Sequence, residues 1–355
     1  MYFNADKNSS VLLEYAYHEL EGEFLDLLNS DDLDRFVTQN PLKAEKFNAA
    51  VDECLFDAFE NDEGYSDAHL FIQRLLYRIN RLKLFWYDEL ENYTNENSAF
   101  LFSLRLKVEN AWQDWERKKI AWFNSGNPIS ALQYRVKEDI QPEPSSDGLF
   151  IRNKISKCEY QHLLAITSID GLVEASQLSR MLGGVGNEVQ TMLTRILWEE
   201  YGSGKLNRKH STHFATMLDE CNLDSTPEAY FDIVPWEVLA NFNHSFFLSE
   251  RKKKYLYYIG GLLYTEVSVP AAFEHIKLAG ERLNIGDKGI SYWAIHIAED
   301  IRHGQWMLDD VVLPLVKKYH KHASDIVQGY DQQKFISTRS TSAIVKSILK
   351  IELTN

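Results

Sequence analysis

Three potential metal ligands recur at helical spacing in the last quarter of the chain. His296, Asp300 and His303 lie within the segment 293–306, which reads Trp-Ala-Ile-His-Ile-Ala-Glu-Asp-Ile-Arg-His-Gly-Gln-Trp. At about 100° per residue, the three positions fall within roughly 60° of arc on one face of a helix. Two imidazoles and a carboxylate on one face suit a divalent transition metal, most naturally iron. Histidines paired with Asp300 on an ordinary helix surface explain the spacing equally well, so the rest of the chain has to decide.

Four further residues could complete a metal site with this face. Glu174 and Glu266 are each the lone acid of an apolar segment, and Glu200 ends an apolar run. A carboxylate in such surroundings is costly to bury unless it is paired or bound to a metal. His210 follows Glu200 after a break that contains two glycines, and this break lets both side chains turn toward one centre.

Apolar periodicity predicts helices along almost the entire chain. Before residue 124 these helices cover 11–28, 41–59, 68–93 and 97–122. After residue 156 they cover 160–182, 187–201, 210–218, 255–283 (kinked by Pro270), 286–308, 315–327 and 342–353. No alternating pattern of useful length indicates a strand. The predicted fold class is therefore all-α, a helical bundle preceded by a smaller helical domain.

Turn-forming residues divide the chain into two parts. The sequence Gln-Pro-Glu-Pro-Ser-Ser-Asp-Gly at 141–148 forbids a continuing helix. We therefore predict a helical domain over 1–128, a linker over 129–156 and a second domain over 157–355. The first domain is rich in Trp and Phe, which could form a core or cover another subunit, so a homodimer is expected.

The composition limits the kinds of partner that the protein could bind and the cellular compartment in which it could work. The net charge of −14 disfavours nucleic acid and anionic membranes. Cys54, Cys158 and Cys221 are an odd number at unrelated spacings, which is typical of a reducing cytoplasm rather than a disulfide framework. The first residues lack the apolar core of a signal peptide, and no run is long enough to span a bilayer. We expect a cytoplasmic protein that acts on a small molecule.

The seven candidate residues together resemble the site of the haem-oxygenase-like diiron oxidases. That family's pattern is a Glu, a second Glu followed ten residues later by a His, a further Glu, and finally His-x3-Asp-x2-His. All seven positions are filled in the right order over roughly residues 157–330, by Glu174, Glu200, His210, Glu266, His296, Asp300 and His303.

The resemblance implies an all-helical enzyme that binds two Fe(II) ions, uses O2 as co-substrate and needs an external reductant, the electron donor. It implies that Glu200 bridges the ions, with Glu174 and His210 on one and the 296–303 face on the other. Glu266 would close the site. Glu200 and Glu266 are the candidate catalytic residues, and Glu299, about 100° around from Asp300, is expected behind the ligands or on the surface.

The preceding helical domain favours one branch of this family, the amine N-oxygenases. The predicted activity is therefore oxidation of the nitrogen of an amino-acid-derived amine or guanidine, by N-hydroxylation and further oxidation toward nitro. One N-nitrosating member carries a cupin domain after its core; this chain shows none, so nitrosation is not expected.

Two alternatives stay open. The same site could carry out oxidative C–C cleavage, desaturation or decarboxylation of an amino or fatty acid. A non-catalytic helical interaction protein would bind no iron.

Other histidines and acids give weaker signals. Glu159 and His162 form a Glu-x-x-His pattern of the kind that ferritin-like diiron proteins use in pairs, but the pattern stands at a helix start beside the linker, and we interpret it as a decoy. Nothing nearby completes a ligand set around the remaining candidates, which are His213, His244, His275, His320 and His322.

Overall fold

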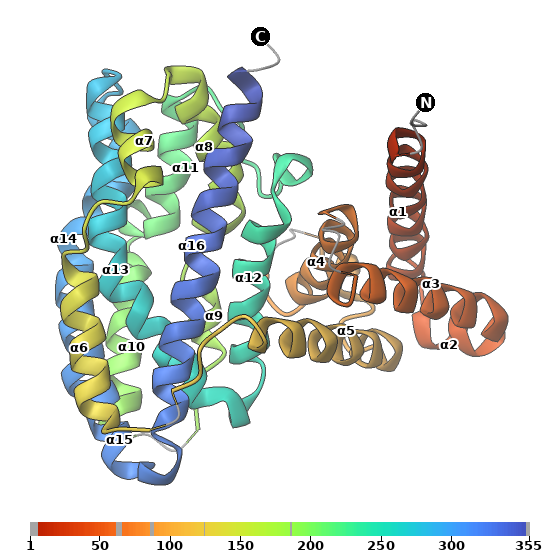
Figure 1. Cartoon of the computed structure of the whole chain (residues 1–355), viewed down its shortest axis with the longest axis horizontal. Helices are drawn as coiled ribbons and strands as arrows, with labels where there is room; N and C mark the ends of the chain where they lie inside the picture. Colours follow the sequence, from red (N-terminus) through yellow and green to blue (C-terminus); the bar gives the residue numbers. More distant parts are fainter. Residues whose placement is uncertain (1–5, 62–65, 86–88, 124, 185–186, 353–355) are drawn as a thin grey trace, which may run out of the picture. The chain divides into compact units, whose positions relative to one another are not determined.

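The computed structural model describes residues 6–61, 66–85, 89–123, 125–184 and 187–352. Helices joined by turns form nearly all of these ranges, and no strand occurs in them (Figure 1). The all-α prediction is therefore confirmed. Contacts divide the chain into two compact units, Met1–Lys119 and Ile120–Asn355.

The first unit is a small group of helices around an apolar core. Phe24, Phe47, Val51, Ile72 and Val108 are almost completely buried. The helices are α1 (Asp6–Leu28), α2 (Leu33–Gln39), α3 (Pro41–Phe59), α4 (Ser66–Arg81), the 3-10 helix η1 (Leu90–Tyr93) and α5 (Ala99–Arg117).

One side chain joins two of these helices. The Asp34 carboxylate of α2 accepts hydrogen bonds from Ser98 Oγ at 2.7 Å and from the backbone nitrogens of Ala99 and Phe100 at 2.8 and 3.0 Å. These nitrogens have no partner within α5, because they belong to its first turn. Asp34 therefore fixes the start of α5 against α2.

The second unit is the larger helical bundle. Its first half contains α6 (Pro128–Ile140), α7 (Ser146–Lys154), α8 (Lys157–Gly171), α9 (Ser176–Ser179), α10 (Glu188–Glu200), η2 (Gly202–Gly204), η3 (Leu206–Arg208), α11 (His210–Glu220) and η4 (Phe231–Ile233). Its second half contains α12 (Trp236–Ser249), η5 (Lys252–Lys254), α13 (Tyr255–Arg282), η6 (Asp287–Ile290), α14 (Ser291–Trp306), η7 (Met307–Val312), α15 (Leu313–Lys318), η8 (His320–His322) and α16 (Ser324–Glu352).

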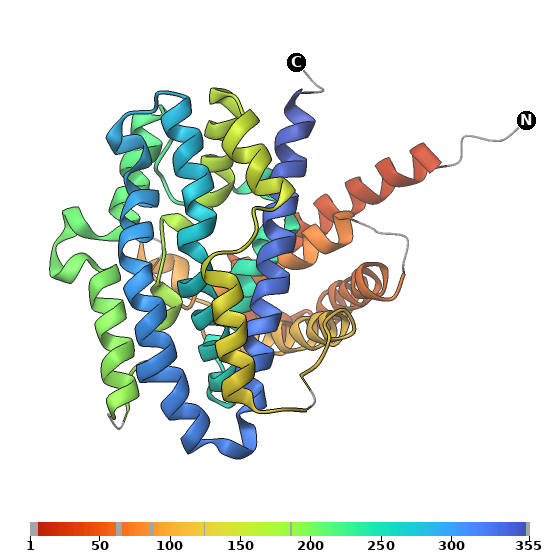
Figure 2. The same cartoon turned by 60° about the vertical axis from the view of Figure 1, so that its left-hand side comes forward.

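The long helices α13 and α16 form the centre of this bundle and run side by side (Figure 2). Their close approach depends on Gly260 of α13 and Gly329 of α16. A Cβ atom at Gly260 would overlap the backbone of Ile326, and one at Gly329 would overlap the backbone of Tyr257. A side chain at either position would force the two helices apart.

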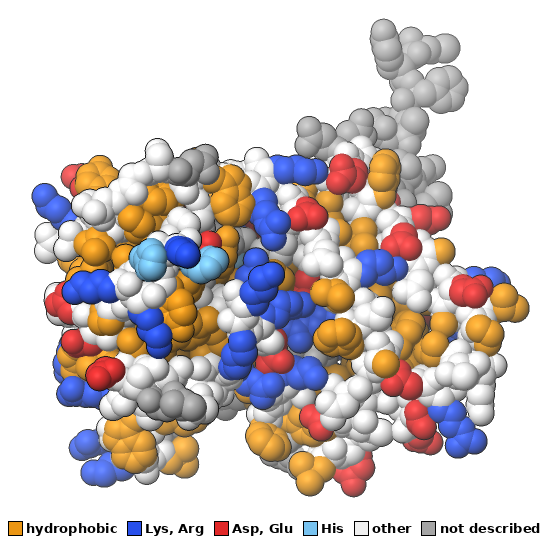
Figure 3. Space-filling model, turned by 90° about the horizontal axis from the view of Figure 1, so that it is seen from below, with side chains coloured by type: hydrophobic (Ala, Val, Ile, Leu, Met, Phe, Trp, Pro, Cys, Tyr) orange, Lys and Arg blue, Asp and Glu red, His pale blue; other side chains and the backbone are white. Residues whose placement is uncertain are grey.

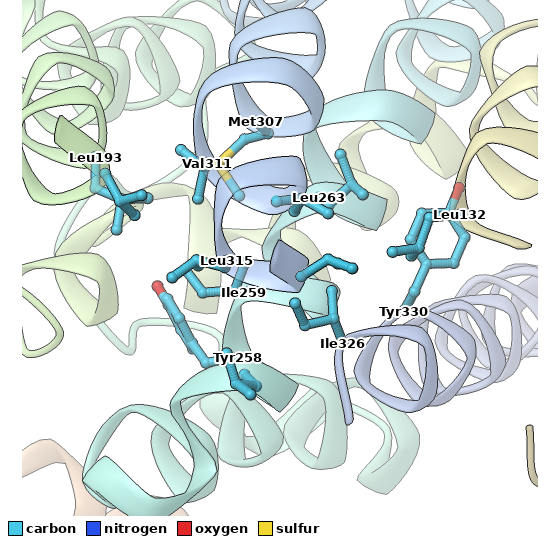
Figure 4. Close-up of a cluster of buried hydrophobic side chains, with 14 of the residues drawn as sticks. Leu132, Leu193, Tyr258, Ile259, Leu263, Met307, Val311, Leu315, Ile326 and Tyr330 are labelled. Carbon is cyan, nitrogen blue, oxygen red and sulfur yellow. The ribbon is translucent and has the colours of Figure 1, made fainter. Parts of the chain in front are cut away.

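An apolar cluster fills the space between α13, α16 and the segment that follows α14. Figure 4 draws part of this cluster and labels Leu132, Leu193, Tyr258, Ile259, Leu263, Met307, Val311, Leu315, Ile326 and Tyr330. The helical path runs from α14 through the π-helical η7 into α15 without a break. The wider π turn lies directly before Pro314, whose ring would clash with the carbonyl four residues earlier in a regular helix.

The segment expected to be a linker, 129–156, differs from that prediction. It forms α6 and α7, and it lies inside the second compact unit. The Asn127 side chain caps α6 by accepting hydrogen bonds from the nitrogens of Ile129 and Ser130, and Leu132 and Val136 are buried in the core. The prolines at 142 and 144 separate the two helices, as expected, but they do not detach them from the bundle.

The last helix also differs from its prediction. The sequence indicated a helix ending near 327 and another starting at 342, whereas α16 is continuous over Ser324–Glu352. The intervening residues are polar because they bond to neighbouring helices. Tyr330 and Lys334 both donate to Asp139 of α6, and Asp331 accepts from Arg135.

Candidate metal centre

Helix α14 presents the three residues of the predicted ligand face to the interior of the bundle. His296, Asp300 and His303 are all buried, with His303 completely so. An aromatic cluster holds the first turn of α14. In it, Trp293 Nε1 donates to Tyr160 Oη at 2.9 Å, and the Trp293 and Phe273 rings meet edge to face.

A tight loop brings Glu200 and His210 together. Helix α10 ends at Glu200, α11 begins at His210, and Gly202 and Ser203 between them have positive φ values of 63° and 51°. A Cβ atom at Gly202 would overlap the backbone of Arg208 and Lys209, so only glycine fits. The reversal places Glu200 Oε2 2.7 Å from His210 Nδ1, and the predicted convergence of these two side chains is observed.

Glu174 lies in a turn and not in the predicted helix over 160–182. Helix α8 ends at Gly171, and Ala175 adopts a left-handed conformation before α9. The apolar pattern continues through this turn, so periodicity alone could not reveal the break. The turn directs Glu174 Oε1 to within 2.8 Å of His296 Nε2.

Glu266 lies one helical turn before Pro270 in α13, which continues to Arg282. A proline has no N–H to bond to the carbonyl four residues earlier, so the Glu266 carbonyl lacks its usual partner within the helix. Gly304 of α14 approaches this carbonyl closely, since a Cβ atom there would lie 3.3 Å from Glu266 O. The close approach of α13 and α14 places Glu266 Oε2 3.3 Å from His303 Nδ1.

All seven predicted residues therefore meet in two overlapping groups. One group is Glu174, Glu200, His210 and His296, and the other is Glu200, Glu266, Asp300 and His303. Within each group, one potential ligand atom from every residue lies within 4.8 Å of the others. Glu200 belongs to both groups, which is the arrangement that a carboxylate bridging two metal ions requires.

The groups differ in one respect from the arrangement implied by the sequence. His296 was expected to share an ion with Asp300 and His303, whereas its imidazole lies with Glu174 and His210. The reason is distance along the helix: seven residues at about 1.5 Å each put His296 and His303 about 10 Å apart along the axis of α14. One helix can therefore supply ligands to two neighbouring ions.

The donors fit a bound cation. Asp300 Oδ1 and Glu174 Oε2 are buried and have no hydrogen-bond partner among the described residues. Burial raises the pKa of Asp300 well above its usual value, and it also raises the pKa of Glu266. Carboxylates in this state are costly to ionise without a counter-charge. A divalent metal supplies that charge, and carboxylate with imidazole ligands suits iron.

The same carboxylates raise the pKa values of two of the histidines. Burial alone would lower the pKa of His303, but the carboxylates of Glu200 and Glu266 raise it to about 11. Burial would also lower the pKa of His210. The carboxylates of Glu200 and Glu299 outweigh this effect and raise the pKa to about 9. Both imidazoles must lose a proton before they can bind a metal.

Each of the three histidines is oriented by a second hydrogen bond on the side away from the ligand groups. His303 Nε2 lies 3.0 Å from Glu199 Oε2, and His210 Nε2 lies 3.1 Å from Glu299 Oε2. His296 Nδ1 lies 2.8 Å from the Tyr292 carbonyl. Such partners fix the ring orientation and the nitrogen that faces a metal.

Sequence reasoning missed Glu199 and left Glu299 undecided between this role and the surface. Glu199 directly precedes Glu200, and Glu299 directly precedes Asp300. Paired acids next to a ligand are the signal that could have revealed both.

A further acid, Asp170, was also missed. It lies in α8, four residues before Glu174, and the residue is exposed at the surface. Desolvation by the surrounding protein, together with the Glu174 carboxylate, nevertheless raises the pKa of Asp170 to about 7, and His296 opposes the shift. The structure shows no hydrogen bond or ion pair of its side chain to another described residue. An accessible acid beside the ligands is available to a substrate.

The other candidates lie outside the centre. Glu159 completes a capping box with Ser156 at the start of α8, and His162 Nε2 lies 2.9 Å from Ser347 Oγ, so the interpretation of this pair as a decoy agrees with the structure. No group of potential ligands in the described part of the chain includes His213, His244, His275, His320 or His322. All three cysteines are free. None of the described helices is long and apolar enough to cross a membrane.

The buried carboxylate–histidine centre of the bundle is compatible with a metal site. Residues 161–333, which contain all seven candidate ligands, match the sequence model of a family described as iron-containing redox enzymes. The resemblance to the haem-oxygenase-like family recognised in the sequence is confirmed for this segment, which makes up just under half of the chain.

One curated relative is the nitrosourea synthase of Streptomyces achromogenes subsp. streptozoticus. It is 28% identical over 171 residues, which cover 47% of this chain. The matched region spans only 36% of the relative's length.

Proposed function

We propose that the second unit binds two Fe(II) ions and uses O2 to oxidise the nitrogen of an amino-acid-derived amine or guanidine. The product is an N-hydroxylated compound or its further oxidation product toward nitro, and an external reductant returns the ions to the ferrous state. The observation that carries this proposal is the pair of ligand groups that share Glu200.

In this proposal the groups divide the ligands between the two ions. Glu174, His210 and His296 hold one ion, and Glu266, Asp300 and His303 hold the other, with Glu200 between them. When bound, the ions supply the binding and reduction of O2. Glu200 and Glu266 are the proposed catalytic carboxylates, because both face the same nitrogen of His303 at 3.3 Å.

Two observations support nitrogen as the atom that is oxidised. The name of the relative indicates a nitrosourea product, and a nitrosourea carries oxygen on nitrogen. We extend only oxidation at nitrogen to this chain, because the match covers a minor part of that protein. The accessible Asp170 carboxylate, in turn, is suited to hold an ammonium or guanidinium group next to the centre.

A substrate screen tests the proposal. The iron-loaded protein, supplied with O2 and a reductant, is incubated with arginine, lysine, their decarboxylated amines and a fatty acid. Mass spectrometry should show oxygen added to nitrogen of an amine or guanidine. An olefin, aldehyde or decarboxylated product would instead assign oxidative C–C cleavage or desaturation, and failure to bind iron would favour a non-catalytic helical protein.

We also propose that the first unit forms a homodimer. Its surface carries exposed large apolar side chains, among them Leu42 and Phe56 of α3 and Phe102 of α5. Analytical ultracentrifugation of the full chain should show a dimer that Phe56→Glu or Phe102→Glu weakens. A wild-type monomer at micromolar concentration would contradict this proposal.

A further inference from the structure

Trp306 connects the candidate metal centre to the protein surface. It is the last residue of α14 and is half-buried. Its ring centroid lies 5.7 Å from that of His303, and the two planes are inclined by 31°. An aromatic ring that is partly exposed thus lies against one predicted ligand.

Two arginines cover the outer part of this tryptophan. The guanidinium of Arg195 on α10 lies 3.9 Å from the Trp306 ring centroid, and that of Arg302 on α14 lies 5.1 Å away. Their side chains remain 55% and 47% exposed. Both charges are therefore held in place on the indole while staying accessible to a partner.

Glu199 ties the same two arginines to His303. Its Oε2 accepts from Arg302 Nη2 at 2.7 Å and lies 3.0 Å from His303 Nε2, and its Oε1 lies 3.6 Å from Arg195 Nε. His303 is consequently linked to the surface both by ring contact and by hydrogen bonds. His303 differs from the other two histidines in being hydrogen-bonded to a carboxylate that also binds exposed arginines. His296 bonds to the carbonyl of the buried Tyr292, and His210 bonds to Glu299.

The surface near these arginines is suited to a protein partner. On α10, Trp198 lies one turn beyond Arg195 and is 56% exposed. On α14, Ile301 precedes Arg302 and is also exposed. Arginine and tryptophan are the side chains most enriched at binding hot spots. The chain has a net charge of −14, so a local pair of arginines is a positive patch on an acidic protein. Such a patch attracts an acidic partner in one orientation.

We infer that Arg195, Arg302 and Trp306 form the docking and electron-entry site for a small acidic iron–sulfur protein. The inference rests on the proposed diiron function. Each reduced carrier that docks loses one electron and is oxidised, and two carriers in turn would supply the two electrons that a diferric centre held by the ligand groups needs. No bond is made or broken at the surface. The electron crosses from the carrier through the Trp306 and His303 rings.

A stronger basic cluster lies too far from the centre to serve this purpose. Figure 3 views the molecule from the end where Lys317, Lys318 and Lys321 are exposed, and it shows Lys or Arg and His side chains gathered there. About 14 residues of continuous helix separate His303 from Lys317, or about 20 Å. Because electron transfer slows steeply with distance, this cluster is the natural control.

Docking is tested first with the metal-free protein. Oxidised plant-type [2Fe–2S] ferredoxin, a small acidic protein, is titrated into the full chain by calorimetry at several salt concentrations. Arg195→Glu should weaken binding by about tenfold or more and flatten its salt dependence, because it reverses a charge at the interface. Lys321→Glu makes the same change in net charge at the distant cluster and should leave binding unchanged.

Electron entry is tested next with the iron-loaded, oxidised protein in a stopped-flow instrument. Trp306→Leu should slow reduction by ferredoxin severalfold while leaving its Kd, the iron content and the rate of reduction by dithionite unchanged. Trp306→Phe keeps a ring at this position and should retain most of the rate, and it replaces the Leu variant if that variant does not fold.

Three results would overturn the inference. They are a wild-type chain that does not bind ferredoxin, equal effects of Arg195→Glu and Lys321→Glu, and reduction rates indifferent to Trp306. A failure of the proposed diiron function would show separately, as a wild-type protein that takes up no iron.

Discussion

His210 Nδ1 lies 2.7 Å from Glu200 Oε2, although a loop of strained glycine and serine conformations separates the two residues. This pair joins the end of α10 to the start of α11, and Glu200 also faces His303 from the other ligand group. The loop 201–209 therefore determines whether one carboxylate can serve two groups at once.

Gly202→Ala should disrupt this relationship. The new Cβ would overlap the backbone of Lys209 at a φ of +63°, so we expect the variant to lose about 1–3 kcal/mol of stability and to bind fewer iron ions. Gly183→Ala is the matched control, since Gly183 also has a positive φ of 92° but has open space around it. Thermal unfolding and iron analysis of both variants measure the difference. Equal iron binding in the two would show that the loop does not position the ligands.

Glu199→Gln and Glu299→Gln should each weaken metal binding without removing a ligand. Partners of ligating histidines typically contribute about 10–100-fold to metal affinity, because they fix the ring and its tautomer. Competitive titration of Fe(II) against a chelator measures the loss. Glu188→Gln, an exposed substitution on α10, provides the control. If both variants bind Fe(II) as tightly as the control, Glu199 and Glu299 do not support the ligating histidines.

The pH dependence of the metal-free protein should report His210. The folded pKa of about 9 lies above the ordinary value of 6.5, so the stabilisation is fully present below pH 6.5 and is lost as the pH rises toward 9. A shift of this size corresponds to at most about 3 kcal/mol. Urea unfolding of the wild-type protein and of His210→Gln should therefore converge at high pH. Parallel stabilities from pH 6 to 10 would contradict a protonated His210.

Sequence periodicity identified the helices, because a buried helix face repeats at a fixed interval. The seven candidate ligands also required the acids in apolar segments and the family's ligand pattern. His296, Asp300 and His303 needed only the geometry of one helix. The division of these three between two groups depends also on ligands from other helices. Gly304 allows α13 to come close to α14, and no local pattern reveals this approach. The sequence also did not reveal that α16 is continuous. Residues in its middle are polar because they bond to distant segments, as Tyr330 does to Asp139, and they interrupt the apolar pattern.

Asp170→Asn should impair substrate binding and leave the metals in place. The carboxylate is not a member of either ligand group, so iron content should equal that of the wild type. We expect a higher KM for substrates whose side chain carries a positively charged amine or guanidine, with little change for an analogue with an uncharged side chain, such as citrulline. Asp219→Asn, an exposed change on α11, is the control. An unchanged KM for every charged substrate would remove Asp170 from the substrate site.

The stoichiometry of iron binding tests the central claim most directly. Anaerobic titration with Fe(II) should saturate at two ions per chain, because two ligand groups share Glu200. Mössbauer spectra after exposure to O2 should then show one spin-coupled diferric centre, which Glu200→Ala should abolish. Saturation at one ion, or at none, would contradict a dinuclear centre in this bundle.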